Sequence, residues 1–404
     1  MGLLNNPASY LNHTHRQQHI KSPRPPLILF ASLFTVAVLP RSLLVSVIPI
    51  EALVLLNNVQ AVSLVYFISG IASILFSLVI PILASRFRAR GLLILGAIAA
   101  IATAFLLNSH QIYLFVIGMM LYTASANMVE IALTLFIMQV VPRREIQRFE
   151  PMRVFFMVIG FLIGPWLGIV LREQISASSP YLLSGIVAVL TIVFMLLLQL
   201  HRLPQDTSRA IPSNPVRYVQ RFSAQPRLRL AWALAVGRAS WWSMFFIYAP
   251  LYAVTSGLGE IIGGAIVSAG VGTVLTVHFW GWIGRRYGLR RMMFWSAMMT
   301  ALAMLVLTAA AGVAWLGVAL WLVAAAAVAP LDAAGNGPFL RAVRSRERPE
   351  MAGVYNTYRD VAQLMPPGIF SVVLRVFELP AVFATTALGM LGIAGLARYL
   401  PRRF

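Results

Sequence analysis

Ionisable side chains inside long apolar runs are the residues of this sequence best suited to chemistry. Arg41 and Arg238 each interrupt such a run, and so do Glu130 and Asp332. A guanidinium group binds a carboxylate or phosphate through two parallel hydrogen bonds, so the two arginines predict a site for an anionic group of a small molecule. The alternatives are that each arginine pairs internally with Glu130 or Asp332, or that it extends to the polar boundary.

The two carboxylates belong to polar helix faces. The spacing places four polar residues on one face, namely Thr123, Asn127, Glu130 and Thr134. A carboxyl group in apolar surroundings can take up a proton near neutral pH. We therefore predict Glu130 as the proton-coupling residue and Asp332 as the second candidate. Asn127 and Asn336, which share their helix faces, are predicted to contact the substrate.

Aromatic residues follow Arg238 in the stretch RASWWSMFFIYAP. Trp241 or Trp242 and then Phe245 recur at helical spacing from Arg238. An aromatic face beside an arginine suits a substrate with an apolar or ring-bearing body, so these three residues are predicted to line the binding site. The alternative is that they only pack or sit at the membrane interface.

The composition places these residues in a membrane protein. The 404-residue chain is 59% hydrophobic and 11% charged, with a mean hydropathy of +0.81, whereas soluble domains are about 25% charged. It contains no cysteine, and its net charge of +20 is carried almost entirely by arginine, because Lys21 is the only lysine. The sequence therefore predicts an integral membrane protein without thiol chemistry.

Apolar runs of about 20 residues predict an all-α membrane protein with twelve transmembrane helices. The expected spans are 27–50, 60–84, 91–109, 112–141, 151–171, 180–200, 229–253, 259–284, 289–311, 313–340, 354–375 and 380–400. They form an N-terminal six-helix half (27–200) and a C-terminal six-helix half (229–400). The remaining segments are an N-terminal tail (1–26), a proline-containing linker (201–228) and a short C-terminus (401–404).

Arginines cluster in alternate loops, after the second, fourth, sixth, eighth and tenth spans. By the positive-inside rule both termini and the linker are cytoplasmic in a bacterial-type inner membrane. The alternation explains the positive charge as an orientation signal and argues against nucleic-acid binding. The carboxylates at the outer ends are expected to be solvated, and these are Glu51, Glu173, Glu260 and Glu378.

The two halves repeat each other. PRS at 40–42 corresponds to GRA at 237–239, and ASRFRARGLL at 84–93 corresponds to GRRYGLRRMM at 284–293. Internal repeats of this kind are typical of secondary transporters, whose substrate site lies near the midplane between the halves.

This architecture resembles the major facilitator superfamily over almost the whole chain. GWIGRRYGLRR (281–291) is similar to the family's motif after the second span of a half, with Arg285 where the family has aspartate. PILASRFRAR (81–90) is a weaker match, because Pro81, Ser85 and Arg88 replace its glycine, aspartate and glycine. The resemblance implies a charge network at the cytoplasmic gate that lacks this aspartate.

The fifth expected span contains GFLIGPWLG, with Gly160, Gly164, Pro165 and Gly168. It resembles a motif of the antiporter, exporting branch of that superfamily. Glycines four apart allow a neighbouring helix to approach closely and the proline bends the helix, so the motif could also serve packing alone.

Three further charges lie near the cytoplasmic ends of the fifth and eleventh spans. They are Arg153, Arg359 and Asp360. The sequence allows either salt bridges that gate the cavity or side chains that extend to the interface.

The predicted function is a monomeric, proton-coupled antiporter that exports a small anionic or amphipathic organic molecule, such as a drug or a siderophore. Its partners are that substrate, protons and the lipid bilayer. An uptake or exchange carrier for organic anions or organophosphates is one alternative, and a membrane sensor that transports nothing is another. No catalytic constellation, cofactor motif or metal site is evident, so an enzyme is not expected.

Overall fold

The computed structural model describes residues 25–142, 144–203, 215–310, 312–344 and 347–401. Within these residues the chain is helical and contains no strand, which confirms the predicted fold class. Eleven helical segments are long and apolar enough to cross a membrane. The expected eleventh span corresponds to α15 (Tyr358–Val373), which has 16 residues and is shorter than the others.

The N-terminal half contains six helices in the structure. They are α1 (Leu27–Leu44), α2 (Val47–Leu56), α3 (Val59–Leu107), α4 (Ile112–Val140), α5 (Ile146–Gln174) and α6 (Ser179–Leu197). The first span comprises α1 and α2, while α3 comprises the second and third spans, Val59–Ile80 and Ile82–Leu107. Six spans therefore occupy this half as expected, although the helices are interrupted at other residues than the sequence predicts.

The linker region contains η2 (Leu200–Arg202) and α7 (Pro215–Ser223) within the described residues. Residues 1–24, 204–214 and 402–404 lie outside them, so the predicted tails and linker stay predictions. The C-terminal half follows, with these elements: α8 (Pro226–Thr255), α9 (Glu260–Gly272), η3 (Thr273–Thr276), α10 (Val277–Tyr287), α11 (Leu289–Ala309), α12 (Ala314–Ala334), α13 (Gly337–Ala342), α14 (Arg348–Tyr355), α15 and α16 (Pro380–Ala397).

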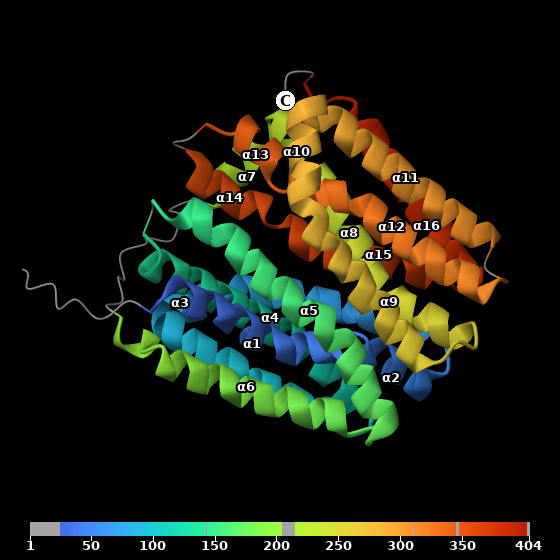
Figure 1. Ribbon diagram of the computed structural model, residues 1–404, viewed down its shortest axis with the longest axis horizontal. Helices are drawn as coiled ribbons and strands as arrows, with labels where there is room; N and C mark the ends of the chain where they lie inside the picture. The colour runs from blue at the N-terminus through green and yellow to red at the C-terminus, as the bar shows by residue number, and fades with distance from the viewer. Residues whose placement is uncertain (1–24, 143, 204–214, 311, 345–346, 402–404) are drawn as a thin grey trace, which may run out of the picture.

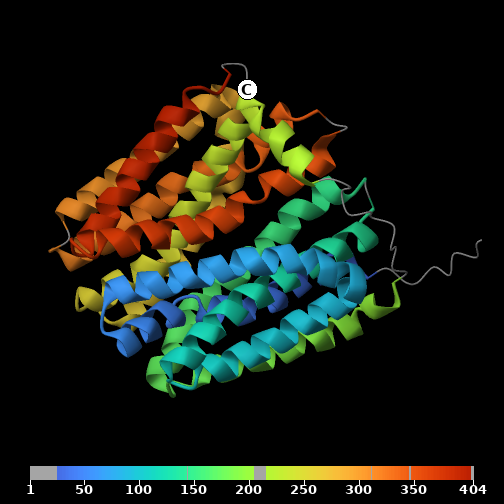
Figure 2. The ribbon, with the colours of Figure 1, turned by 180° about the vertical axis from the view of Figure 1, so that it is seen from behind.

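The two halves form two groups of helices that lie against each other (Figures 1 and 2). The most extensive contacts between them are those of α5 with α9, α3 with α15, and α2 with α8. Within the halves, α1 packs against α5 and α6, and α11 packs against α12 and α16. The boundary between the halves is therefore built from the first, second and fifth spans and their C-terminal counterparts.

The glycines of α5 allow it to contact α1 at backbone distance. A Cβ atom on Gly164 would lie 2.1 Å from Ser42 Oγ, and one on Gly168 would lie 2.0 Å from the Leu43 carbonyl oxygen. The Ser42 hydroxyl donates a hydrogen bond of 2.9 Å to the Gly160 carbonyl. Only glycine leaves room for this approach.

The opposite side of α5 contacts the other half. A Cβ atom on Gly264 of α9 would lie 3.0 Å from the Pro165 carbonyl oxygen. The Ser268 hydroxyl accepts a hydrogen bond of 3.0 Å from the Trp166 backbone N–H. The GFLIGPWLG segment is therefore held between α1 and α9 and connects the two halves.

Arg88 occupies a backbone conformation suited to glycine. It interrupts α3 with φ 58° and ψ −179°, a region that costs a residue with a side chain about 1–3 kcal/mol. The corresponding position of the C-terminal half is Gly288, with φ 93°. The replacement of the motif's glycine by Arg88 therefore leaves the loop between the second and third spans strained.

Gly164→Ala is expected to destabilise the protein by about 1–3 kcal/mol, because its methyl group must displace Ser42. The measurement is thermal unfolding of purified protein in detergent, followed by tryptophan fluorescence. Gly185→Ala is the matched control, since its Cβ would lie 3.9 Å from Ala104 Cβ, and it should stabilise by about 0.5–1 kcal/mol. Equal melting temperatures for the two variants would contradict the close packing of α5 on α1.

Arg88→Gly is expected to stabilise the protein by about 1 kcal/mol, because relief of strain exceeds the added freedom of the unfolded chain. The same unfolding measurement checks it. Arg88→Ala removes the charge but keeps a Cβ atom, so it should give little gain. A gain of the same size in both variants would assign the effect to charge and not to backbone strain.

Candidate functional site

A cavity of about 270 Å³ lies between the two halves. Residues from both halves line it, among them Arg41, Ile48, Tyr66, Gly70, Tyr122, Glu130, Trp242, Phe246, Arg359 and Gln363. These residues come from α1, α2, α3 and α4 on one side and from α8 and α15 on the other. The cavity therefore occupies the position between repeats where transporters bind their substrates.

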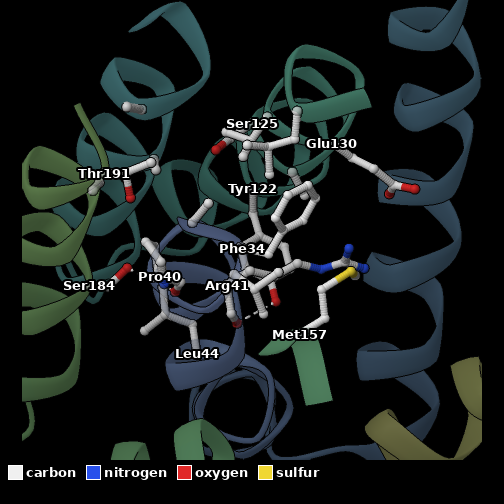
Figure 3. A pocket seen from close by; sticks show the side chains of 18 of the residues that line it. Phe34, Pro40, Arg41, Leu44, Tyr122, Ser125, Glu130, Met157, Ser184 and Thr191 are labelled. Carbon is white, nitrogen blue, oxygen red and sulfur yellow. Dashed lines mark hydrogen bonds between the residues drawn. The ribbon is translucent and has the colours of Figure 1, made fainter. Parts of the chain in front are cut away.

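Arg41 lies at the middle of the first span and borders this cavity. Its Nε atom is buried without a hydrogen-bond partner, while its carbonyl oxygen accepts a hydrogen bond of 2.9 Å from the Tyr122 hydroxyl. Arg41 also lines a smaller cavity of about 80 Å³ inside the N-terminal half, beside Ser184 and Thr191 (Figure 3). A buried guanidinium N–H without an acceptor favours an anionic ligand.

Glu130 and Arg359 form an ion pair across the two halves, from α4 to α15. Both side chains are partly solvated, with 40% of Glu130 and 52% of Arg359 exposed. Both residues also line the cavity between the halves. The partner of Glu130 is therefore Arg359, whereas the sequence had suggested Arg41 or Arg238.

Arg238 and Asp332 form an ion pair inside the C-terminal half, with 3.6 Å between Nη1 and Oδ1. The Trp242 indole N–H donates a hydrogen bond of 2.9 Å to the second oxygen of Asp332. Arg238 does not appear among the residues that line the cavity between the halves. Its geometry matches the internal pair that the sequence left open, and a substrate role for Arg238 or Asp332 stays a prediction.

The aromatic residues of α8 divide between two faces. Trp242 lines the cavity together with Phe246, a residue that sequence reasoning missed although it lies four positions after Trp242. Trp241 and Phe245 stack with 5.1 Å between ring centres, and both are buried in the core of the C-terminal half. The aromatic residues of α8 that line the cavity thus lie one position after the pair that is buried in the core.

The predicted asparagines lie apart from each other. Asn127 donates a hydrogen bond of 3.4 Å to Ser73 Oγ, and Ser73 donates one of 3.2 Å to Gln363 Oε1. This chain of polar groups joins α4, α3 and α15 beside the cavity. Asn336 accepts a hydrogen bond of 3.4 Å from the Tyr355 hydroxyl inside the C-terminal half.

The remaining predicted gating residues lie at the arginine-rich end of the spans. Arg153 makes an ion pair with Glu150 on the same helix, and its guanidinium lies 5.7 Å from the centre of the Phe34 ring. Asp360 follows Arg359 on α15 and is half-buried. Arg359 is the member of this group that crosses between the halves.

The opposite end of the bundle is held by a buried cluster around Arg172. Arg172 pairs with Glu51 and donates a hydrogen bond of 2.9 Å to Glu260 of the other half. The Glu51 carboxylate also lies 3.0 Å from His110 Nδ1, and Glu51 is only 2% exposed. The expectation that Glu51 and Glu260 are solvated is wrong, because Arg172 provides both with a cationic partner.

Comparison with known proteins agrees with this architecture. The family model described as Major Facilitator Superfamily matches residues 30–278. No curated protein matches the sequence.

Several solved structures share the fold. A D-xylose-proton symporter superposes with a TM-score of 0.68 at 14% identity, covering 93% of this chain and 97% of that chain. A POT family transporter in complex with 5-aminolevulinic acid gives 0.70 at 13% identity, with 90% and 94% covered. The nucleoside transporter NupG gives 0.66 at 14% identity, with 91% and 98% covered.

At these identities the solved structures establish the fold alone. The family match extends over more than half of the chain and includes Arg41, Glu130, the α5 glycines and Arg238. It indicates a transporter and not an enzyme. The chain belongs to the major facilitator superfamily, as the motifs of its sequence had indicated.

Proposed function

We propose that this transporter carries a small organic anion, or an amphipathic molecule with an anionic group, and couples its movement to protons. The observation that carries the proposal is the buried, unpartnered Nε of Arg41 beside the cavity between the halves. Arg41 binds the anionic group, and Trp242 and Phe246 contact the apolar or ring-bearing body.

Glu130 is the proposed proton carrier, and its ion pair with Arg359 sets how proton and substrate interact. With Glu130 ionised, its charge offsets that of Arg359, and Arg41 supplies the remaining positive charge. Protonation of Glu130 frees Arg359 and raises the positive charge around the cavity by one unit. An anion then binds more tightly to the protonated carrier, whereas a neutral or cationic molecule gains nothing or is repelled.

This linkage relates the direction of coupling to the charge of the substrate. For an anion, proton and substrate bind together, so the site favours proton-anion symport and hence uptake. Export by proton antiport is the second candidate, and the GFLIGPWLG segment between α1 and α9 favours it. A drug or siderophore that binds through a part of the molecule without negative charge fits export by proton antiport.

The proposed setting is a monomer in the cytoplasmic membrane with both termini in the cytoplasm, as the arginine-rich loops predict. The Glu130–Arg359 pair then lies on the cytoplasmic side of Arg41, and the Arg172 cluster lies on the outer side. Substrate reaches Arg41 from the cytoplasm in this conformation. Opening of the outer side requires that Arg172 release Glu260.

Transport is tested in proteoliposomes that contain a trapped pH indicator, with mono- and dicarboxylates, phosphate esters and cationic dyes added in turn. Uptake of an anion together with protons supports symport, whereas proton release against entry of a dye or siderophore supports antiport. Binding of a compound without flux of any kind would contradict both and indicate a sensor.

Arg41→Gln should lower transport of the active compound about tenfold or more, because a charge-assisted hydrogen bond is lost. Glu130→Gln should abolish the accompanying proton movement while exchange of the labelled compound continues. Arg229→Gln, at an exposed position at the start of α8, is the control and should match the parent protein. Proton movement that survives in Glu130→Gln would remove Glu130 from the coupling step.

Loss of the Arg172 cluster should open the outer side of the cavity. The chain has no cysteine, so Thr123→Cys, in the cavity lining, reports access of a membrane-impermeant maleimide. Glu260→Gln should raise its labelling from the outer side about fivefold or more, the factor for ~1 kcal/mol. Glu173→Gln, at an exposed carboxylate of the same end, is the control, and equal labelling in both variants would argue against the cluster as a closure.

A further inference from the structure

A separate cavity of about 380 Å³ lies in the C-terminal half between α10, α11 and α12. Its volume falls within the ~300–1,000 Å³ of typical small-molecule sites. It shares no lining residue with the cavity between the halves. The transport mechanism therefore does not use this cavity.

The cavity has one charged end and one apolar end. Arg291, in the first turn of α11, lines it at the arginine-rich end of the bundle, and Trp295 and Met299 follow along the same helix. Eight residues separate Arg291 from Met299, a distance of about 12 Å along a helix. Ala327 and Pro330 of α12 line the facing wall, where the Ser296 hydroxyl donates a hydrogen bond of 2.5 Å to the Ala327 carbonyl. The shape suits an elongated molecule with a polar head.

Its aromatic residues face the surroundings of the bundle. Tyr287 and Trp295 are each 57% exposed, and Trp280 also lines the cavity. Exposed tyrosine and tryptophan side chains at the end of a transmembrane helix are typical of the boundary between lipid headgroups and hydrocarbon. The cavity therefore opens toward lipid and not toward the substrate path.

The segment of the chain that forms its polar end carries charges of one sign. The loop carries Arg285, Arg286, Arg290 and Arg291, and the sequence contains no acidic residue between Glu260 and Asp332. The guanidinium of Arg286 lies over the rings of Trp282 and Tyr287, 5.5 and 5.8 Å from their centres. The first N–H groups of α11 add further positive potential. This end therefore selects a negatively charged head.

We propose that this cavity binds one anionic phospholipid. The phosphate contacts Arg291, the glycerol region lies beside Tyr287, and an acyl chain runs along Trp295 and Met299 of α11, with Ala327 on the facing wall. Basic pockets between transmembrane helices bind anionic headgroups, and here an apolar wall beside the basic residue accommodates the acyl chain. The N-terminal half has Gly91 where the C-terminal half has Arg291, and the segment 77–105 contains no tryptophan.

The test is native mass spectrometry of the purified full-length protein, titrated with phosphatidylglycerol or phosphatidylcholine. We expect one phosphatidylglycerol to remain bound at concentrations where phosphatidylcholine does not. Arg291→Gln should weaken phosphatidylglycerol binding about fivefold and leave phosphatidylcholine unchanged. Ala327→Phe fills the cavity and should weaken binding of the acyl chain.

Two matched variants serve as controls. Arg86→Gln removes an arginine from the corresponding loop of the N-terminal half, and Ala326→Phe adds the same ring at an exposed neighbour of Ala327. Both should bind phosphatidylglycerol like the parent protein.

Equal retention of the two lipids by the parent protein would overturn the proposal, as would equal losses in Arg291→Gln and Arg86→Gln. Displacement of the lipid by inorganic phosphate alone would also count against it, because the acyl chain would then contribute nothing. Arg291 lies at the surface and its substitution leaves the helix core intact, so this variant decides the question even if Ala327→Phe fails to fold.

Discussion

An unpaired charge is costly in an apolar medium, and this cost determines how the ionisable side chains of this protein are arranged. Such a charge costs at least ~2.5–3.5 kcal/mol near the centre of a bilayer, and several acidic residues of the described helices lie beside an arginine. Glu51 is buried against Arg172, and Asp332 lies between Arg238 and Trp242. Arg41 departs from this pattern, because its Nε atom is buried with no partner. This departure is the basis on which we propose Arg41 as the residue that binds the anionic group of the substrate.

The repeat supplies two equivalent arginine positions, but the halves use them differently. Arg238 is held by Asp332 of α12, whereas Glu130 of the N-terminal half reaches across to Arg359 of α15. The N-terminal half thereby keeps a guanidinium available, and the C-terminal half supplies Trp242 and Phe246 to the same cavity. A repeated scaffold thus produces an asymmetric cavity, with Arg41 on one side and the aromatic side chains of Trp242 and Phe246 on the other.

The sequence predicts the spans well, because the length and composition of an apolar run decide whether it can cross a bilayer. The sequence predicts less well which side chains contact or pair with each other. Successive helix residues differ by about 100° in direction, so Trp242 reaches the cavity while Trp241 and Phe245 turn into the core. The Arg172 cluster depends on three spans distant in sequence, and no local pattern identifies Glu51 as its member. The glycines of α5 were recognisable, since their spacing alone predicts a flat helix face.

The ion pairs that join the halves differ in strength because they differ in solvation. At the end opposite the arginine-rich loops, Arg172 and Glu260 are more shielded, with 11% and 23% of their side chains exposed. At the arginine-rich end, Glu130 and Arg359 remain 40% and 52% exposed. Exposed pairs contribute about 0–1 kcal/mol, whereas breaking a buried one costs about 3–5 kcal/mol. The Glu130–Arg359 pair can therefore separate at small cost, whereas separation of Arg172 from Glu260 costs more.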